Sequence, residues 1–167
     1  EPLDVDAVGG ETVARVLGQV EGIQCSQHFS NAEDAIDALM GGAVPDVILL
    51  DVELPGQNGI DAIRKIRSIS PETRIVMLTV FDDHDKVFKA VCAGASGYLL
   101  KTSAVEEIVH SIHEALNGGA PMSPRVAKSV LDMFAALGKP KHDYGLTERE
   151  VKILELMTQG LLKKEIA

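Results

Sequence analysis

Asp46-Val-Ile-Leu-Leu-Asp51 is the stretch that decides the fold, because its four central residues are apolar without interruption. A strand with one solvated face alternates apolar and polar residues, whereas a short continuous apolar run is typical of a strand covered on both faces. Such strands belong to parallel sheets that lie between two layers of helices. Arg74 to Thr79 and Gly97 to Lys101 show the same pattern, and Ile23 to Phe29 is a weaker candidate strand.

Helix signals fill the gaps between these strands. Ser30-x-x-Glu33 and Ser103-x-x-Glu106 have the spacing of capping boxes, and Gly94 is a C-terminal stop. The alternation of strands and helices predicts a doubly wound α/β sheet, followed by one more helix after Ser123. The predicted helices span Ala32 to Met40, Ile60 to Arg67, His84 to Ala93, about Ser103 to Leu116, and Pro124 to Leu137.

Charge is distributed unevenly along the 167 residues. Residues 1–137 contain 10 Lys and Arg against 20 Asp and Glu, a net charge of −10, and residues 138–167 contain 6 against 5, a net charge of +1. The total of −9 argues against a chain that is mainly a nucleic-acid binder. The tail is therefore expected to present a different kind of surface from the first, acidic part.

The sequence shows no membrane or export signal. Residues Glu1 to Asp4 include no basic start, and the longest apolar stretches are far shorter than the ~20 residues that cross a bilayer. Cys25 and Cys92 lie in apolar surroundings without metal-ligand spacing. We therefore expect a cytoplasmic protein with no membrane partner, and both cysteines as reduced thiols in the core.

Three polar residues stand at the ends of consecutive predicted strands: Asp51, Thr79 and Lys101. The carboxyl ends of parallel strands meet at one edge of the sheet, so a carboxylate, a hydroxyl and an ammonium are expected to converge there. Any one of them alone is an ordinary polar strand end. Together they favour phosphoryl transfer, with Asp51 as the nucleophile, Lys101 pairing with the phosphoryl oxygens and Thr79 donating a hydrogen bond to one of them.

The same segments carry a resemblance to a known family. Pro45 to Gly59 resembles the phosphorylation segment of two-component receiver domains, and Leu78 to Asp83 and Gly94 to Lys101 resemble the family's threonine and lysine motifs. Leu146 to Val151 and Leu156 to Ala167 resemble the opening of a LuxR-type helix-turn-helix. The chain thus resembles response regulators of the NarL/FixJ family.

This resemblance implies a flavodoxin-like, five-stranded receiver domain over residues 1–120, a linker with a helix over 121–145, and the N-terminal fragment of a helix-turn-helix domain over 146–167. The second helix of that motif supplies the base contacts, and this chain stops before it. DNA binding is therefore implied for the complete protein. Lys163 and Lys164 are candidate phosphate contacts, although two lysines on an exposed turn are more often only solvated.

The resemblance also implies a Mg²⁺ site that contains the Asp51 carboxylate and the Glu53 backbone carbonyl. Family members carry two adjacent acidic ligands at the end of the first strand. Counting back from Asp51 places that pair near Asp4, with Asp6 following, so only alternate positions are acidic; Glu1 is a further candidate. Either residues upstream of this sequence supply the strand, or Leu3 to Val8 form an abbreviated one.

The implied mechanism is a switch. A sensor histidine kinase would phosphorylate Asp51, and Tyr98 would turn inward as Thr79 moves toward the phosphoryl group. The altered surface would favour a homodimer and DNA binding, and so regulate transcription without enzymatic turnover. The alternative for Tyr98 is a half-buried strand aromatic.

Two other functions remain open at this point. A defective acidic pocket would make the domain a phosphate-independent interaction module with a receiver fold. Asp51-Val-Glu53 also resembles the paired acids of haloacid-dehalogenase phosphatases, but Thr102 to Val105 supplies none of the acidic metal ligands that such an enzyme needs after its lysine.

Overall fold

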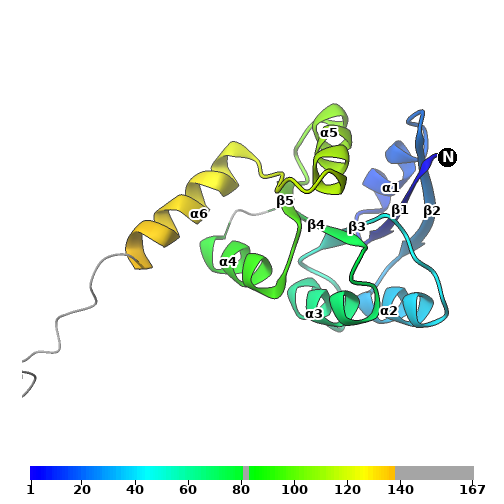
Figure 1. Ribbon diagram of the computed structural model, residues 1–167, viewed down its shortest axis with the longest axis horizontal. Coiled ribbons are helices and arrows are strands. Elements are labelled where there is room, and N and C mark those ends of the chain that lie inside the picture. The colour runs from blue at the N-terminus through cyan, green and yellow to red at the C-terminus, as the bar shows by residue number, and fades with distance from the viewer. Residues whose placement is uncertain (81–82, 138–167) are drawn as a thin grey trace, which may run out of the picture. The chain divides into compact units, whose positions relative to one another are not determined.

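The computed structural model describes residues 1–80 and 83–137, and its centre is a five-stranded parallel sheet (Figure 1). The strand order is β2-β1-β3-β4-β5, which is the flavodoxin-like order and confirms the predicted fold class. All five residues of β3 are buried, as its continuous apolar run predicts. The strands are β1 (Leu3–Val8), β2 (Ile23–Phe29), β3 (Val47–Asp51), β4 (Arg74–Thr79) and β5 (Gly97–Leu100).

Helices cover both faces of this sheet. In Figure 1, α1 and α5 lie on one face and α2, α3 and α4 on the other. The side chains of each strand alternate between two apolar clusters, so that Ile48 and Leu50 belong to one and Val47 and Leu49 to the other. The helices are α1 (Glu11–Leu17), α2 (Ala32–Met40), α3 (Gly59–Ile69), α4 (His84–Ala93), α5 (Val105–Leu116) and α6 (Pro124–Leu137).

The first strand is present within this chain. Leu3–Val8 pairs with both β2 and β3, so it is an interior strand of the sheet. The seven-residue helix α1 follows at once and was not predicted. Gly9 and Gly10 separate the two elements, both with positive φ, so the strand ends at a turn only two residues long.

Both predicted capping boxes are wrong. At α2 the N-cap is Asn31, one residue after Ser30, and its side chain accepts a hydrogen bond from the Asp34 backbone at 2.8 Å. At α5 the N-cap is Ala104, which offers no side-chain cap, and Ser103 lies one residue before it. The predicted start of α2 at Ala32 is confirmed with a different cap, whereas α5 starts at Val105, later than predicted.

Helix α6 begins where Ser123-Pro124 predicts, and it is anchored to the receiver part of the chain. Val126 is fully buried in the same cluster as Tyr98 of β5, and Met122 forms an isolated parallel bridge with Tyr98. The chain divides into two compact units, residues 1–134 and 135–167. The predicted helix-turn-helix segment, with Lys163 and Lys164, lies outside the described residues. Among the described helices, none is long and apolar enough to span a membrane.

Candidate functional site

Asp51, Thr79 and Lys101 meet at the carboxyl edge of the sheet, as predicted. Asp51 pairs with Leu78, so Thr79 lies one position beyond Asp51 on the neighbouring strand. Lys101 directly follows β5, and its backbone nitrogen donates a hydrogen bond to the Thr79 carbonyl at 2.7 Å. Parallel pairing of β3, β4 and β5 thus places the three residues side by side.

The Asp51 carboxylate is almost completely enclosed, with 8% of the residue exposed. One oxygen, Oδ2, contacts the Lys101 ammonium, and the other, Oδ1, accepts a hydrogen bond from the Glu53 backbone at 3.1 Å. A buried carboxylate needs such partners, because an unpaired charge in this position is strongly destabilising. Among the described residues, the site thus brings one carboxylate and one ammonium into direct contact.

The loop after β3 is held tightly against Asp51. A Cβ atom at Gly59 would lie 1.9 Å from the Asp51 carbonyl oxygen, so only glycine fits where α3 begins. The Asn58 side chain caps α3 by accepting from Ile60, and Glu33 of α2 accepts from the Gln57 backbone at 2.9 Å. These contacts fix the segment that follows the candidate phosphoacceptor.

The Glu53 carboxylate turns away from Asp51 toward α4. It accepts a hydrogen bond from Lys86 at 2.9 Å, and this bond raises the pKa of Lys86. Both side chains are substantially exposed, so the pair contributes little to stability, at most about 1 kcal/mol. Its effect is to tie the loop after β3 to α4.

Two glycines directly follow β1, the strand next to Asp51. Val8 pairs with Leu50, which brings Gly9 level with Asp51, and a Cβ atom at Gly9 would lie 2.7 Å from the Asp51 Cβ. Gly9 and Gly10 carry no side chain, so β1 presents no carboxylate at this edge. Among the described residues there is also no group of three His, Cys, Asp or Glu that could hold a metal ion.

Comparisons with known proteins assign the fold and these motifs to one family. The model of the response regulator receiver domain matches residues 6–113. The chain belongs to the response regulator family. It is 40% identical over 123 residues to the transcriptional regulatory protein LiaR of Bacillus subtilis, with 73% of this chain covered, and 32% identical over 156 residues to the response regulator UvrY of Escherichia coli, with 93% covered.

A solved structure of a response regulator has a similar fold. The two-component response regulator of the LuxR family from Aurantimonas sp. SI85-9A1 shares 28% identity and superposes with a TM-score of 0.73, over 81% of this chain and 99% of that one. The present chain spans only 58% of the length of LiaR and 71% of UvrY. These relatives are named as regulators of transcription or as response regulators, and none of these names supports the phosphatase alternative.

In this response regulator the expected acidic ligands do not reach Asp51. Asp6 pairs with Ile48, three residues before Asp51, which corresponds to roughly 10 Å along the strand. Burial and the nearby charge of Asp4 raise the pKa of Asp6 to about 6, while a hydrogen bond from the Gln27 backbone opposes that shift. Asp4 lies further back still, where its backbone nitrogen donates to Asp46 at 2.9 Å.

The Mg²⁺ site implied by the family therefore does not fit the residues present. Mg²⁺ is usually bound through one or two carboxylates that leave room for several waters. At the edge of this sheet the Asp51 carboxylate is engaged by Lys101, and the adjoining turn contributes only glycines. The signal was present in the sequence, because a Gly-Gly pair before a helical pattern marks a strand end.

Tyr98 is fully buried, not half-buried. Its backbone nitrogen donates to the Pro121 carbonyl at 2.9 Å, and its ring belongs to the cluster that contains Val87 of α4 and Val126 of α6. The aromatic side chain is thus enclosed between the receiver sheet and the helix that leads toward the tail. This contact was not foreseen, since it depends on where α6 packs.

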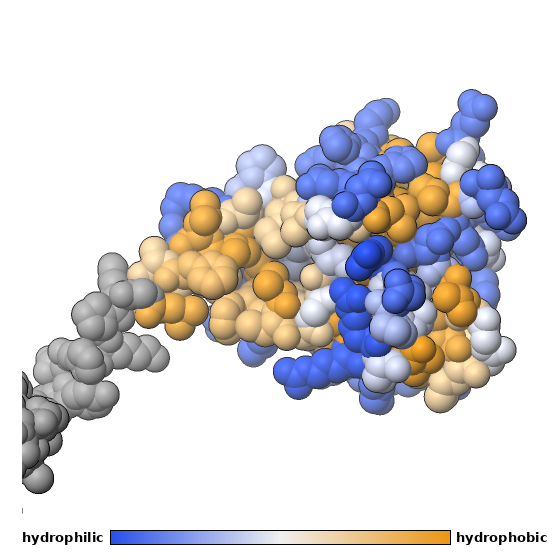
Figure 2. Space-filling view, viewed as in Figure 1, coloured by the Kyte–Doolittle hydropathy of each residue, from blue (hydrophilic) through white to orange (hydrophobic). Residues whose placement is uncertain are grey.

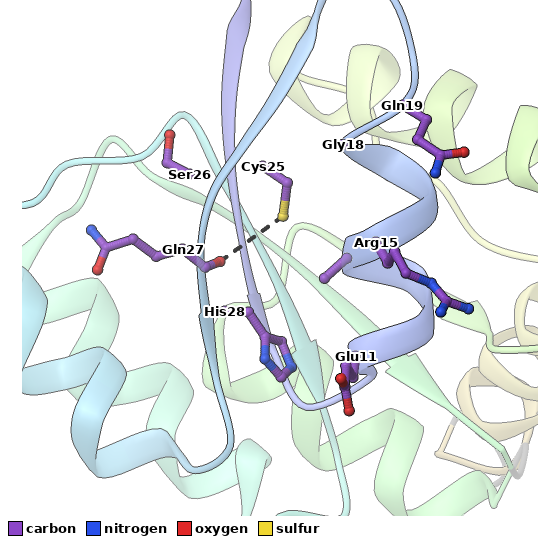
Figure 3. A pocket seen from close by; sticks show the side chains of 9 residues that line it. Glu11, Arg15, Gly18, Gln19, Cys25, Ser26, Gln27 and His28 are labelled. Atoms are coloured by element: carbon purple, nitrogen blue, oxygen red, sulfur yellow. Dashed lines mark hydrogen bonds between the residues drawn. The ribbon is translucent and has the colours of Figure 1, made fainter.

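A surface hollow lies between α1 and β2, away from the Asp51 site (Figure 3). It has a volume of about 540 Å³, and Arg15, Cys25 and His28 are among the residues that line it. Burial, followed by the charges of Asp6 and Asp4, raises the pKa of the Cys25 thiol, so this thiol is a poor nucleophile. The expectation of two core cysteines is wrong, because Cys25 is half-buried and Cys92 is exposed.

Proposed function

We propose that this chain is the regulatory half of a transcription regulator, in which the receiver domain controls a DNA-binding module that begins near residue 146. The observation that carries the proposal is the meeting of Asp51, Thr79 and Lys101 at the edge of a sheet with receiver topology. The names of LiaR and UvrY support it, as does the greater length of both relatives. Such a regulator would work in the cytoplasm, where its DNA lies.

Asp51 is the proposed input position, and two kinds of input fit the family. A sensor histidine kinase would transfer a phosphoryl group to the Asp51 carboxylate, adding charge and acceptor oxygens beside Lys101. A partner protein would instead bind the receiver surface without phosphoryl transfer. The glycine turn at Gly9 and Gly10 favours the second input, because it leaves the site without the carboxylates that a Mg²⁺-assisted transfer needs.

The proposed output route runs through β5 and α6. The Lys101 backbone nitrogen donates a hydrogen bond to the Thr79 carbonyl at the end of β4. Tyr98 lies three residues before Lys101, within β5. Tyr98 and Val126 are both fully buried in one cluster, so a shift of β5 disturbs the packing of α6. In the sequence, helix α6 precedes the segment that resembles the DNA-binding module, with residues 138–145 between them.

We also propose that the complete protein acts as a homodimer through α6. Leu131 and Phe134 stand one turn apart on this helix with 65% and 61% of each residue exposed, and Figure 2 shows apolar side chains gathered on this part of the surface. Helix-turn-helix proteins commonly bind two half-sites as symmetric dimers. A second copy of the chain is therefore the partner that suits this surface.

The experiment for the proposed function compares DNA binding by the complete protein with that of two lysine variants. Lys101→Met removes the cation from Asp51, and we expect it to change the DNA dissociation constant at least several-fold. Lys89→Met, at an exposed position on α4, is the matched control and should leave binding unchanged. A folded Lys101→Met protein that binds DNA as the unmodified protein does would contradict receiver control.

A further inference from the structure

We infer that the Asp51 site takes no Mg²⁺ and that the receiver domain controls its output without phosphorylation of Asp51. This inference rests on the proposed function and deepens it, because it selects between the two inputs. Its basis is the geometry of three neighbours of the Asp51 side chain, namely the glycine turn after β1, the Lys101 ammonium and the Glu53 loop.

The first step concerns the turn after β1. A Cβ atom at Gly9 would lie 2.7 Å from the Asp51 Cβ and 2.9 Å from a methyl carbon of Leu54. Space for a side chain at this position is therefore absent, and Gly9 also has a φ of +75°, which side-chain-bearing residues rarely adopt. The turn position that faces Asp51 after β1 is thus built for glycine and excludes a carboxylate.

The second step concerns the remaining acids. Asp6 is level with Ile48, three residues before Asp51 on β3, and the Glu53 carboxylate accepts a hydrogen bond from Lys86 of α4. Asp83 accepts from the Asp85 backbone as the N-cap of α4. Among the described residues, Asp51 is therefore the carboxylate in direct contact with Lys101.

The third step concerns the charge of the site. The Asp51 carboxylate and the Lys101 ammonium are in direct contact and sum to zero. A dication entering this pocket would meet one carboxylate that is already paired and one ammonium that repels it. Two carboxylates at the end of β1 would have given the pocket a net negative charge, and here their place is occupied by glycines.

The consequence for chemistry follows from the charges of the reactants. Transfer of a phosphoryl group to a carboxylate brings two anions together, and metal ions normally bridge and neutralise the transferring oxygens. Lys101 supplies one positive charge, and its ammonium is already paired with the Asp51 carboxylate. The carboxylate therefore remains unmodified, and the receiver works as an interaction module whose state is fixed by the Asp51–Lys101 pair.

Intact-mass spectrometry tests this inference on the chain as it is. The protein is incubated with acetyl phosphate and Mg²⁺, alongside Asp51→Asn, and a second receiver domain that reacts with the same donor is present in the same tube as a positive control. We expect the control receiver to gain one phosphoryl group while this chain keeps its mass. A gain in this chain that is absent in Asp51→Asn would overturn the inference, whether or not chelation of Mg²⁺ abolishes it.

Measurements of DNA binding by the complete protein distinguish a failure of this inference from a failure of the proposed function. Acetyl phosphate with Mg²⁺ should leave its DNA dissociation constant unchanged, within about two-fold, whereas Lys101→Met should alter it. A donor-induced change of tenfold or more that Asp51→Asn removes would overturn the inference and leave receiver control intact. Insensitivity to both treatments would instead contradict the proposed function while the chain's unchanged mass still upheld the inference.

Discussion

Gly9 and Asp51 lie so close together that a Cβ atom on the glycine would approach the Asp51 Cβ to 2.7 Å. The contact joins the turn that follows the interior strand β1 to the candidate phosphoacceptor on β3. It decides the electrostatics of the site, because it leaves Lys101 as the partner of a carboxylate that is almost fully enclosed. A response regulator fold is thereby combined with a site that has glycines, and no carboxylate, directly after β1.

Gly59→Ala should destabilise the protein strongly. The new methyl group would lie 1.9 Å from the Asp51 carbonyl oxygen, and overpacking against backbone costs about 3 kcal/mol or more. Gly42→Ala is the control, since nothing lies within 4 Å of its Cβ position and its positive φ alone costs about 1 kcal/mol. Urea denaturation measures both, and equal losses for the two variants would show that the close approach at Gly59 is not rigid.

The Asp51–Lys101 pair should show strong coupling in a double-mutant cycle. Lys101→Met leaves a carboxylate that is only 10% exposed without its cation, whereas Asp51→Asn leaves an ammonium that is 25% exposed. We therefore expect Lys101→Met to cost more stability, with a coupling free energy of roughly 1–3 kcal/mol. Additive effects of the two substitutions in chemical denaturation would rule out a direct energetic link.

Asp6 should make stability depend on pH in the direction opposite to most carboxylates. Burial raises its pKa to about 6 in the folded protein, from 3.8, so the folded state favours the protonated form. The contribution of Asp6 to the free energy of unfolding is fully present below its unfolded-state pKa. This contribution is lost as the pH rises through about 6. Asp6→Asn should therefore stabilise the protein by about 1–3 kcal/mol near pH 7 and have little effect near pH 4.

Denaturation curves of both proteins at the two pH values check this prediction. The gain should grow between the two values, because only the unmodified protein must bury an ionised carboxylate at the higher pH. An equal effect of Asp6→Asn at both pH values would show that the substitution acts through packing and not through charge.

Val126→Ala should loosen α6 from the receiver domain. Val126 is fully buried beside Tyr98, and removal of its two methyl groups should cost about 2 kcal/mol. Lys128→Ala on the same helix is the control, because 71% of its side chain is exposed and its loss should stay within about 0.5 kcal/mol. Hydrogen exchange of α6 amides should accelerate in the first variant only; unchanged protection there would argue against anchoring through this residue.

Phe134→Ser should weaken self-association of the complete protein. The ring is 61% exposed on α6, so a serine removes apolar area from the proposed dimer surface with little effect on folding. Lys128→Ala, at a charged position of the same helix whose side chain is 71% exposed, serves for comparison. Analytical ultracentrifugation should show a dimer constant weakened about tenfold or more for Phe134→Ser, and an unchanged constant would move the dimer surface elsewhere.

Most of the fold and the core of the site were predictable from the sequence. Continuous apolar runs identified β3 and β4, and their polar ends brought Asp51, Thr79 and Lys101 together through the topology of a parallel sheet. These features depend on local pattern and on pairing rules that hold for any doubly wound sheet.

The register of β1 was not predictable in the same way. Its position relative to Asp51 depends on the lengths of the turn, α1 and β2 that intervene, and counting back along the chain placed the strand end near Asp4 instead of Val8. The burial of Tyr98 depends on α6, which is remote in sequence. Tertiary contacts of this kind leave no periodic signal.

Titration with Mg²⁺, followed by amide chemical shifts, tests the central claim about the site most directly. We predict that the amides of Gly9, Glu53 and Lys101 keep their shifts as Mg²⁺ is added. A saturable shift confined to these three amides would show that the pocket binds the ion despite its glycines, and would contradict a site without Mg²⁺.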